Sequence, residues 1–182
     1  MRWIDSHVHV WTPDTVSYPT KSGTDWDDRL PKDFTPETLF RYARPSQVQR
    51  FVLIAHQIYY GTDNSYMLDA VQRWPEVFRI VGFINHRGAK VSEEMKNLQT
   101  LGVAGFRIVP DSGKEMTWLQ EPGYSDMFNI AAETGQSICP LIRPKSMSEL
   151  DRMCKQHPNT SVVIDHLASV GLGGDLNDED VK

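Results

Sequence analysis

The sequence predicts an α/β fold in which parallel strands alternate with helices within one domain of 182 residues. Three observations favour this class. Near-continuous apolar runs, such as Phe51-Val52-Leu53-Ile54-Ala55, are typical of strands covered on both faces, as in parallel sheets. Stretches with helical periodicity separate these runs. The runs recur every few tens of residues, the length of one βα unit, so six units predict a barrel or a doubly wound sheet.

Each expected strand is a short apolar or β-branched run, and the six runs fall at 2–7, 50–56, 78–84, 103–109, 137–142 and 160–166. The apolar lead-in Trp3-Ile4 predicts that the first strand is buried. The first strand is not followed by the glycine-rich turn of a dinucleotide-binding fold, because histidines occupy that turn.

Helices are expected between the strands, at 36–43, 63–74, 90–101, 124–134 and 146–156. Thr35-Pro36 predicts the start of the first helix, since a capping residue precedes a proline at the first helical position. Gly102 and Gly135 follow their helices where a left-handed cap is expected.

The loop from about Val10 to Pro31 is unusually long for a compact domain, and such loops are usually functional or disordered. Its aromatic residues Trp11, Tyr18 and Trp26 favour an ordered lid. At the other end, the acidic stretch 175–182 resembles a helix start without a body, and the alternative is a frayed tail. A closed (β/α)₈ barrel normally takes about 250 residues, so we expect strands 7 and 8 to be missing from this chain.

The composition is that of an ordinary globular protein, with 40% apolar and 24% charged residues. The formal net charge is −5 and the 19 Lys and Arg residues form no stripe, so neither a nucleic acid nor an anionic membrane is an expected partner. No apolar run approaches about 18 residues, so we expect no membrane span. The N-terminus also lacks the basic and then apolar pattern of a signal peptide. Two cysteines without metal-type spacing, Cys139 and Cys154, predict a reduced cytoplasmic protein.

The most informative motif is the histidine pair of Asp5-Ser6-His7-Val8-His9. Residues two apart in a strand project to the same face, so His7 and His9 leave one strand end side by side and could hold one divalent ion. The alternative is two polar residues at an exposed terminus. A second apolar run, Val162-Val163-Ile164-Asp165-His166, also stops at a histidine.

In a parallel barrel the active site lies at the carboxyl ends of the strands. His56, Asn85-His86 and His166 follow three further expected strands, so these histidines are predicted to meet His7 and His9 at one mouth. Taken singly, His56 and His86 have the alternative of supporting loop positions, and His157 is expected on a helix-terminal surface. Asp165 is predicted to point outward, as a partner that supports the site.

Arg107 lies in an otherwise apolar strand, so its guanidinium must meet an anion. Two interpretations stay open: a structural salt bridge, or a clamp on a substrate carboxylate or carbonyl. The residues expected to contact a substrate are Arg107, Trp11, His56, Tyr59, Tyr60, His86 and Arg143. For Arg143 the alternative is loop surface. For Tyr59 and Tyr60 it is capping of the second helix, although Asp63 or Asn64 is the better capping residue.

Several segments together resemble the amidohydrolase superfamily, in its branch of small single-barrel hydrolases that includes 2-pyrone-4,6-dicarboxylate lactonases and sugar lactonases. The similar segments are Asp-Ser-His-Val-His-Val-Trp at 5–11, Tyr-Tyr-Gly-Thr-Asp-Asn-Ser-Tyr at 59–66, Arg-Trp-Pro-Glu-Val-Phe-Arg-Ile-Val-Gly-Phe-Ile-Asn at 73–85, Gly-Val-Ala-Gly-Phe-Arg at 102–107 and Ile-Asp-His-Leu-Ala at 164–168. The resemblance spans nearly the whole chain in the right order.

The resemblance implies a (β/α)₈ TIM-barrel hydrolase of which this chain holds about the first six units, as one incomplete domain over residues 1–182. It implies that His7 and His9 are metal ligands, and that His166 is a third ligand or polarises the substrate carbonyl. Zn²⁺ is the expected ion and Mn²⁺ the alternative, although some lactonases of this branch work without a tightly bound metal. The general base would be an aspartate on strand 8, which lies beyond this sequence.

Many relatives outside the lactonase branch carry a histidine at the end of strand 5, whereas this chain has Ser137-Ile-Cys-Pro-Leu-Ile-Arg143. We therefore expect hydrolysis of a lactone, or of a related cyclic ester or amide, from a small anionic organic acid or sugar acid. Arg107 and His166 are the expected catalytic residues. The alternatives are a decarboxylase of an unsaturated acid on the same barrel and a catalytically silent binding domain. The expected partners are a small-molecule substrate and a second copy of the chain.

Overall fold

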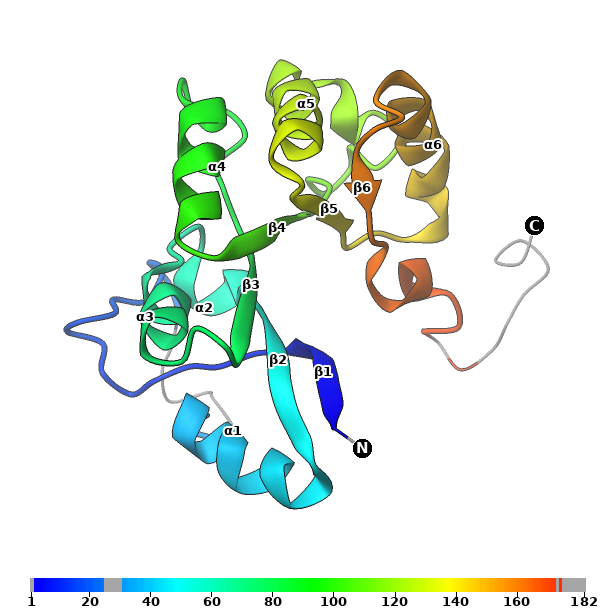
Figure 1. The fold of residues 1–182 in the computed structure, drawn as a ribbon. Coiled ribbons are helices and arrows are strands. Elements are labelled where there is room, and N and C mark those ends of the chain that lie inside the picture. Colours follow the sequence, from blue (N-terminus) through cyan, green and yellow to red (C-terminus); the bar gives the residue numbers. More distant parts are fainter. Residues whose placement is uncertain (1, 25–30, 173, 175–182) are drawn as a thin grey trace. The chain divides into compact units, whose positions relative to one another are not determined.

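A computed structural model describes residues 2–24, 31–172 and 174. The chain divides into two compact units, Met1–Ile84 with Leu98–Ala104, and Asn85–Asn97 with Gly105–Lys182. Figure 1 follows the chain in colour, from the blue strand β1 to the orange strand β6. The six strands of the described residues occur in chain order along the sheet, β1-β2-β3-β4-β5-β6.

The first unit is built of parallel strands with helices between them. Its strands are β1 (Trp3–Val8), β2 (Val48–Ile54) and β3 (Phe78–Gly82), and its helices are α1 (Pro36–Ala43), α2 (Gln57–Tyr60) and α3 (Ser65–Arg73), with a 3-10 turn η1 (Arg44–Ser46) before β2. β1 pairs with β2 and β2 with β3, both in parallel. This alternation confirms the predicted α/β class.

The second unit repeats the pattern. Its elements are α4 (Val91–Thr100) and β4 (Val103–Ile108), which both cross the boundary between the units, then α5 (Pro122–Thr134), β5 (Ser137–Pro140), α6 (Met147–Gln156) and β6 (Ser161–Val162), with the 3-10 turns η2 (Trp118–Gln120), η3 (Pro144–Ser146) and η4 (Asp165–Ser169). β4 pairs with β5 and β5 with β6, again in parallel. Six parallel strands in chain order with intervening helices correspond to the first six units of a (β/α)₈ barrel.

The start of α1 matches its prediction because the capping chemistry is local. The Thr38 backbone N–H donates to Thr35 Oγ1 at 3.3 Å, and Pro36 occupies the first helical turn. The predicted left-handed glycines are confirmed as well, since φ is +97° at Gly102 and +72° at Gly135.

The core of the first unit is an aromatic stack between α1 and the sheet. The rings of Phe40 and Phe78 are stacked with centroids 5.5 Å apart, and Phe51 lies 5.8 Å from Phe78. All three side chains are buried. Burial of each contributes about 1.5–3 kcal/mol to stability, so this stack fixes α1 against β2 and β3.

An asparagine side chain extends the hydrogen bonding of β3. Asn64 Nδ2 donates to the Phe83 carbonyl at 2.8 Å, and the Phe83 backbone N–H donates to Asn64 Oδ1 at 3.0 Å. This two-way bond places the Asn64 amide beside Gly82, where a Cβ atom would lie 2.8 Å from Asn64 Oδ1. Gly82 therefore provides the space in which Asn64 holds the end of β3.

The prediction of a seven-residue strand at 160–166 is wrong, because β6 comprises only Ser161 and Val162. Val162 pairs with Ile138, and the Val163 N–H donates to the Ile138 carbonyl at 2.9 Å. The next residue of β5 that faces β6 is Pro140, which has no N–H to donate. The ladder therefore stops there and the chain turns away before His166.

The prediction that Trp3 and Ile4 are buried is also wrong, since their exposed fractions are 56% and 54%. Among the described residues β1 has one partner strand, β2, and this pairing leaves both side chains accessible.

The described part of the long first loop is ordered, as predicted. Trp11 and Phe34 exchange backbone hydrogen bonds of 3.0 Å, and the Lys21 N–H donates to the Tyr59 carbonyl at 2.7 Å. The predictions for Trp26 and for the acidic stretch 175–182 lie outside the described residues. No helix in the described part of the chain is long and apolar enough to cross a membrane.

Candidate active site

The two N-terminal histidines lie side by side at the carboxyl end of β1. Their ring centroids are 5.3 Å apart in an edge-on arrangement, and both residues are half-buried. The β1–β2 register shifts between Asp5 and Val8, and such irregularities re-aim side chains next to active sites. The predicted adjacency of His7 and His9 is confirmed.

The orientation of the His9 ring is fixed by the neighbouring strand. His9 Nδ1 lies 2.7 Å from the Ile54 carbonyl oxygen at the end of β2. Because a carbonyl can only accept a hydrogen bond, Nδ1 carries the proton and the lone pair of the neutral ring lies on Nε2. This backbone-anchored tautomer is the usual support of a metal-binding histidine.

An aromatic wall adjoins the histidine pair. The His56 ring centroid is 4.9 Å from that of His9, and His56 stacks flat on Tyr59 at 3.7 Å. Trp11 meets Tyr59 edge-on at 5.7 Å and also reaches His56 at 6.1 Å. The predicted substrate-contacting residues Trp11, His56 and Tyr59 are thus brought together beside the histidines.

Tyr60 adjoins this wall, with its ring edge-on to Tyr59 at a centroid distance of 6.5 Å. It is buried, and its hydroxyl oxygen accepts a hydrogen bond of 3.1 Å from the Thr12 backbone N–H. This contact connects α2 to the first loop. A substrate contact by Tyr60 stays a prediction.

The donor set at the end of β1 fits a divalent ion in part. His7 and His9 supply two imidazoles from one strand end, and His9 has the tautomer that ligation requires. Within residues 2–24, 31–172 and 174, no group of three or more His, Cys, Asp or Glu side chains is arranged to hold a metal ion. His166 as a third ligand stays a prediction.

In the second unit, Arg107 is paired with Asp165. Arg107 Nε and Nη2 lie 2.8 and 2.7 Å from Asp165 Oδ2, and the exposed fractions of the two side chains are only 6% and 9%. This is the structural salt bridge that the sequence left open as one alternative. Asp165 is buried against Arg107 and is therefore a structural partner, one of the roles predicted for it. Its outward direction and a role in supporting a ligand stay predictions.

Cys139 lies next to this ion pair, opposite Arg107 in the β4–β5 register. Burial, followed by the nearby Asp165 carboxylate, raises the pKa of the Cys139 thiol to about 12. The thiol is therefore protonated and inert at neutral pH.

His166 is presented by a turn of unusual backbone geometry. Residues 166–169 have φ values of 52°, 50°, 56° and 60°, in the left-handed region. This conformation costs a non-glycine residue roughly 1–2 kcal/mol, and backbone strain of this kind is common at functional sites. The turn is held on one side by Asp165 and on the other by Ser169 Oγ, which donates to the Ile142 carbonyl at 3.1 Å.

His86 is part of an ionic network near the start of α5. Its Nε2 lies 3.0 Å from Glu121 Oε2, and its ring stacks on Tyr124 at 4.0 Å. Hydrogen bonds from Arg87, then from His86, lower the pKa of Glu121 to about 2. Gly123 allows this packing, because a Cβ atom there would collide with the His86 carbonyl at 1.7 Å. These contacts agree with the loop position that the sequence named as an alternative for His86, and its contact with a substrate stays a prediction.

Arg143 is exposed and lines a pocket of about 300 Å³ that also borders Ser146 and Ser169. The position agrees with the predicted loop surface and also leaves the guanidinium accessible to a ligand.

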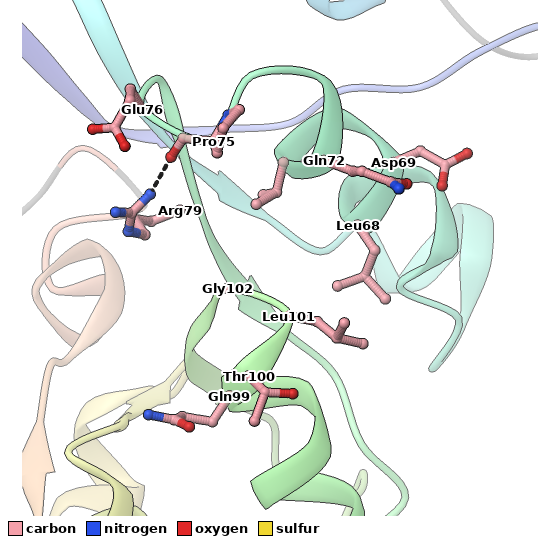
Figure 2. Close-up of a pocket in the computed structure, with 11 residues that line it drawn as sticks. Leu68, Asp69, Gln72, Pro75, Glu76, Arg79, Gln99, Thr100, Leu101 and Gly102 are labelled. Atoms are coloured by element: carbon pink, nitrogen blue, oxygen red, sulfur yellow. Dashed lines mark hydrogen bonds between the residues drawn. The ribbon is translucent and has the colours of Figure 1, made fainter.

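A larger cavity of about 640 Å³ lies at the other end of the first unit. Figure 2 shows Leu68 and Leu101 at this cavity, with Arg79 Nη1 donating to the Pro75 carbonyl. Its walls come from the carboxyl ends of α3 and α4 and from the segments that enter β3 and β4. It therefore lies at the amino ends of the strands, opposite the end that carries His7 and His9, where barrels place stabilising rather than catalytic residues.

Sequence reasoning did not identify Glu121, although it directly precedes Pro122 at the start of α5. The spacing of Ser146-Met147-Ser148-Glu149 predicts a capping box at the start of α6, and this prediction is wrong, because the Ser146 side chain makes no capping hydrogen bond. The lack of a hydrogen-bond partner for Ser146 Oγ among the described residues is visible only in three dimensions.

Solved structures of similar fold come from several bacteria. A probable 2-pyrone-4,6-dicarboxylic acid hydrolase from Acinetobacter baumannii, solved with citric acid, is 22% identical with a TM-score of 0.74, over 93% of this chain and 60% of that one. A zinc-bound amidohydrolase from Burkholderia multivorans is 18% identical, with a TM-score of 0.74, over 94% and 60%. A 5-carboxyvanillate decarboxylase from Sphingomonas paucimobilis is 15% identical, with a TM-score of 0.68, over 94% and 69%.

At these identities the likeness shows the fold, and the chain spans about 60% of the length of the first two structures. A comparison with curated proteins finds no match. The sequence profile of the amidohydrolase family matches residues 4–180. Because this match runs through the paired histidines of β1 and all six βα units, the chain belongs to the amidohydrolase family.

Proposed function

We propose that the full-length protein hydrolyses a lactone, or a related cyclic ester or amide, of a small organic acid or sugar acid that carries a negative charge. The observation that carries this proposal is the His7–His9 pair, with its 5.3 Å ring separation and its backbone-anchored tautomer. Membership of the amidohydrolase family supports a hydrolytic enzyme.

His7 and His9 would hold the divalent ion, with Zn²⁺ as the first candidate and Mn²⁺ as the second, and His166 as a third ligand stays a prediction from the sequence. Such an ion polarises a substrate carbonyl and lowers the pKa of bound water. The residues of the chain provide the surroundings: the Ile54 carbonyl orients His9, and the wall of Trp11, His56 and Tyr59 excludes water from one side.

Arg107 acts in this proposal through Asp165. The buried pair anchors the turn that carries His166, so Arg107 is a positioning residue. The other alternative from the sequence is a direct contact between Arg107 and a substrate. In that case the guanidinium would have to bind the substrate and Asp165 at the same time.

The choice of a lactone over other substrates is supported by β5 and the segment after it. Pro140, Leu141, Ile142 and Arg143 follow one another there without the histidine that many relatives outside the lactonase branch carry. A solved structure of similar fold is named as a hydrolase of a pyrone dicarboxylic acid. Decarboxylation is the second candidate, because two other such structures are named as decarboxylases of aromatic carboxylic acids.

The test uses the full-length protein with a panel of pyrone and sugar lactones, metal analysis, and detection of carbon dioxide. We expect acid release without carbon dioxide. His7→Ala and His9→Ala should each lower both metal content and kcat/KM by about 100-fold or more, since even supporting residues of metal sites cost 10–100-fold. His157→Ala is the matched control. His157 follows the last residue of α6, and its ring is hydrogen-bonded to Asn129 of α5.

Carbon dioxide as a product would select the decarboxylase. Wild-type activity in both histidine variants would overturn the proposal for either reaction.

A further inference from the structure

The pocket of about 300 Å³ in the second unit lies at the carboxyl ends of β4 and β5. Val109 and Pro110 line it after β4, and Leu141 to Arg143 line it after β5. Ser169, from the turn that carries His166, forms part of the wall through its bond to Ile142. The pocket therefore opens next to the turn that presents His166, at the strand ends where barrels bind substrates.

One polar side-chain atom of the residues that line this pocket has no hydrogen-bond partner among the described residues. Ser146 is fully buried, with an exposed fraction of 0%, and its Oγ makes no hydrogen bond. Its position before α6 would suit a helix cap, but the side chain makes no capping bond. A buried hydroxyl without a partner costs about 1–3 kcal/mol, so its retention needs an explanation such as a bound group.

Two further features at the same place attract negative charge. Ser146 ends the 3-10 turn η3 and directly precedes α6, a helix of 10 residues whose dipole is positive at that end; the Met147 N–H is already bonded to the Pro144 carbonyl. Arg143 lines the pocket, is exposed, and makes no ion pair within the part of the chain that the structure describes. A donor hydroxyl, a helix amino end and a cation thus converge on one cavity.

We propose that this pocket is a carboxylate subsite, in which a ligand carboxylate accepts hydrogen bonds from Ser146 Oγ and the Arg143 guanidinium at the amino end of α6. The inference deepens the proposed function and rests on it for the ligand, a substrate with a carboxylate some distance from its reacting carbonyl. The subsite would hold that carboxylate while the carbonyl lies near His166.

A carboxylate fits this lining better than a phosphate does. Arg143 is the cation that the described pocket residues offer, and its planar fork matches two carboxylate oxygens. The pocket also borders Glu115, whose charge is paired with Lys145 at 3.0 Å. A phosphate with two negative charges would be repelled by the Glu115 carboxylate, and Arg143 alone would have to balance its charge.

The experiment titrates the full-length protein with glutarate, with its uncharged diamide, and with inorganic phosphate. Calorimetry gives the Kd values, and amide NMR shifts of Ser146, Met147 and Ser148 locate the binding. We expect glutarate to bind and to shift these amides, and the diamide to fail. Ser146→Ala and Arg143→Gln should each weaken glutarate binding by about tenfold, because each removes a hydrogen bond to a charged group.

Matched controls separate recognition from folding. Ser148→Ala makes the same change at an exposed position two residues further on, and Lys155→Ala removes an exposed cation from the other end of α6. Both should leave the Kd unchanged. Ser146→Ala should keep or raise the Tm, since it removes an unpartnered hydroxyl; a structural serine would lower it.

Equal binding of glutarate by wild type, Ser146→Ala and Arg143→Gln would overturn the subsite, as would equal binding of the diamide. Tighter binding of phosphate would overturn the assignment to carboxylates. Glutarate binding requires no turnover, so a protein that binds it at Ser146 but hydrolyses no lactone would refute the proposed function and leave the subsite standing.

Discussion

The two histidine-bearing segments of this protein are constructed differently. His7 and His9 lie at the end of a six-residue strand that pairs with β2, and one backbone carbonyl orients the second ring. His166 follows a strand of two residues and sits in a left-handed turn that a buried ion pair anchors. The comparison teaches that histidines can be positioned by strand pairing in one region and by a buried ion pair between distant residues in another. The two regions should therefore respond differently to mutation.

The largest effect is expected at the ion pair. Asp165→Asn should lower the free energy of unfolding by about 3–5 kcal/mol, because it leaves the Arg107 guanidinium buried without its counter-charge. Urea unfolding of the full-length protein measures this loss. Glu133→Gln, which breaks the exposed pair with Lys96, is the control and should change stability by about 0.5 kcal/mol or less. A similarly small loss for Asp165→Asn would show that the turn is held by other contacts.

A smaller effect is expected at the strand-borne histidine. His9→Ala in the metal-free protein should cost only about 1 kcal/mol, since it removes one hydrogen bond to the Ile54 carbonyl. The same urea titration measures it, with His157→Ala beside it. A loss as large as that of Asp165→Asn would remove the distinction between the two regions.

The smallest effect concerns the backbone of the turn. Leu167 has a φ of 50° and an exposed fraction of 82%, so its side chain contributes little packing. Leu167→Gly should stabilise the protein by about 0.5–1 kcal/mol, because relief of the left-handed strain outweighs the entropy cost of glycine. Leu172→Gly, at another exposed leucine, provides the reference. Destabilisation by Leu167→Gly relative to this reference would contradict the strain argument.

The sequence predicts most of the fold because the relevant signals are local. Thr35 and Pro36 define the start of α1, and the apolar runs at β2, β3 and β4 mark buried parallel strands. The end of β6 could not be obtained in this way, because it depends on Pro140 in the neighbouring strand. A proline on the adjacent strand stops a ladder only once the pairing register is known.

In the candidate site, too, the features set by local sequence could be predicted, and those set by distant residues could not. The adjacency of His7 and His9 follows from the two-residue period of a strand, so the sequence was sufficient. The partner of Arg107 lies 58 residues away, and the sequence could require an anion there without identifying Asp165. The sequence predicts Ser146 as a helix cap, and it could not reveal that the hydroxyl lacks a partner among the described residues, since that is a property of its surroundings.

The pair of hydrogen bonds between the Asn64 amide and the Phe83 backbone has an evolutionary consequence. Because a methyl group at position 82 would press against the Asn64 amide, the two positions cannot drift independently. A homologue with a side chain at position 82 should carry a smaller residue at position 64. The end of its third strand would then need a different hydrogen-bond partner in place of the Asn64 amide. Covariation between these two columns in a family alignment would therefore be a record of this constraint.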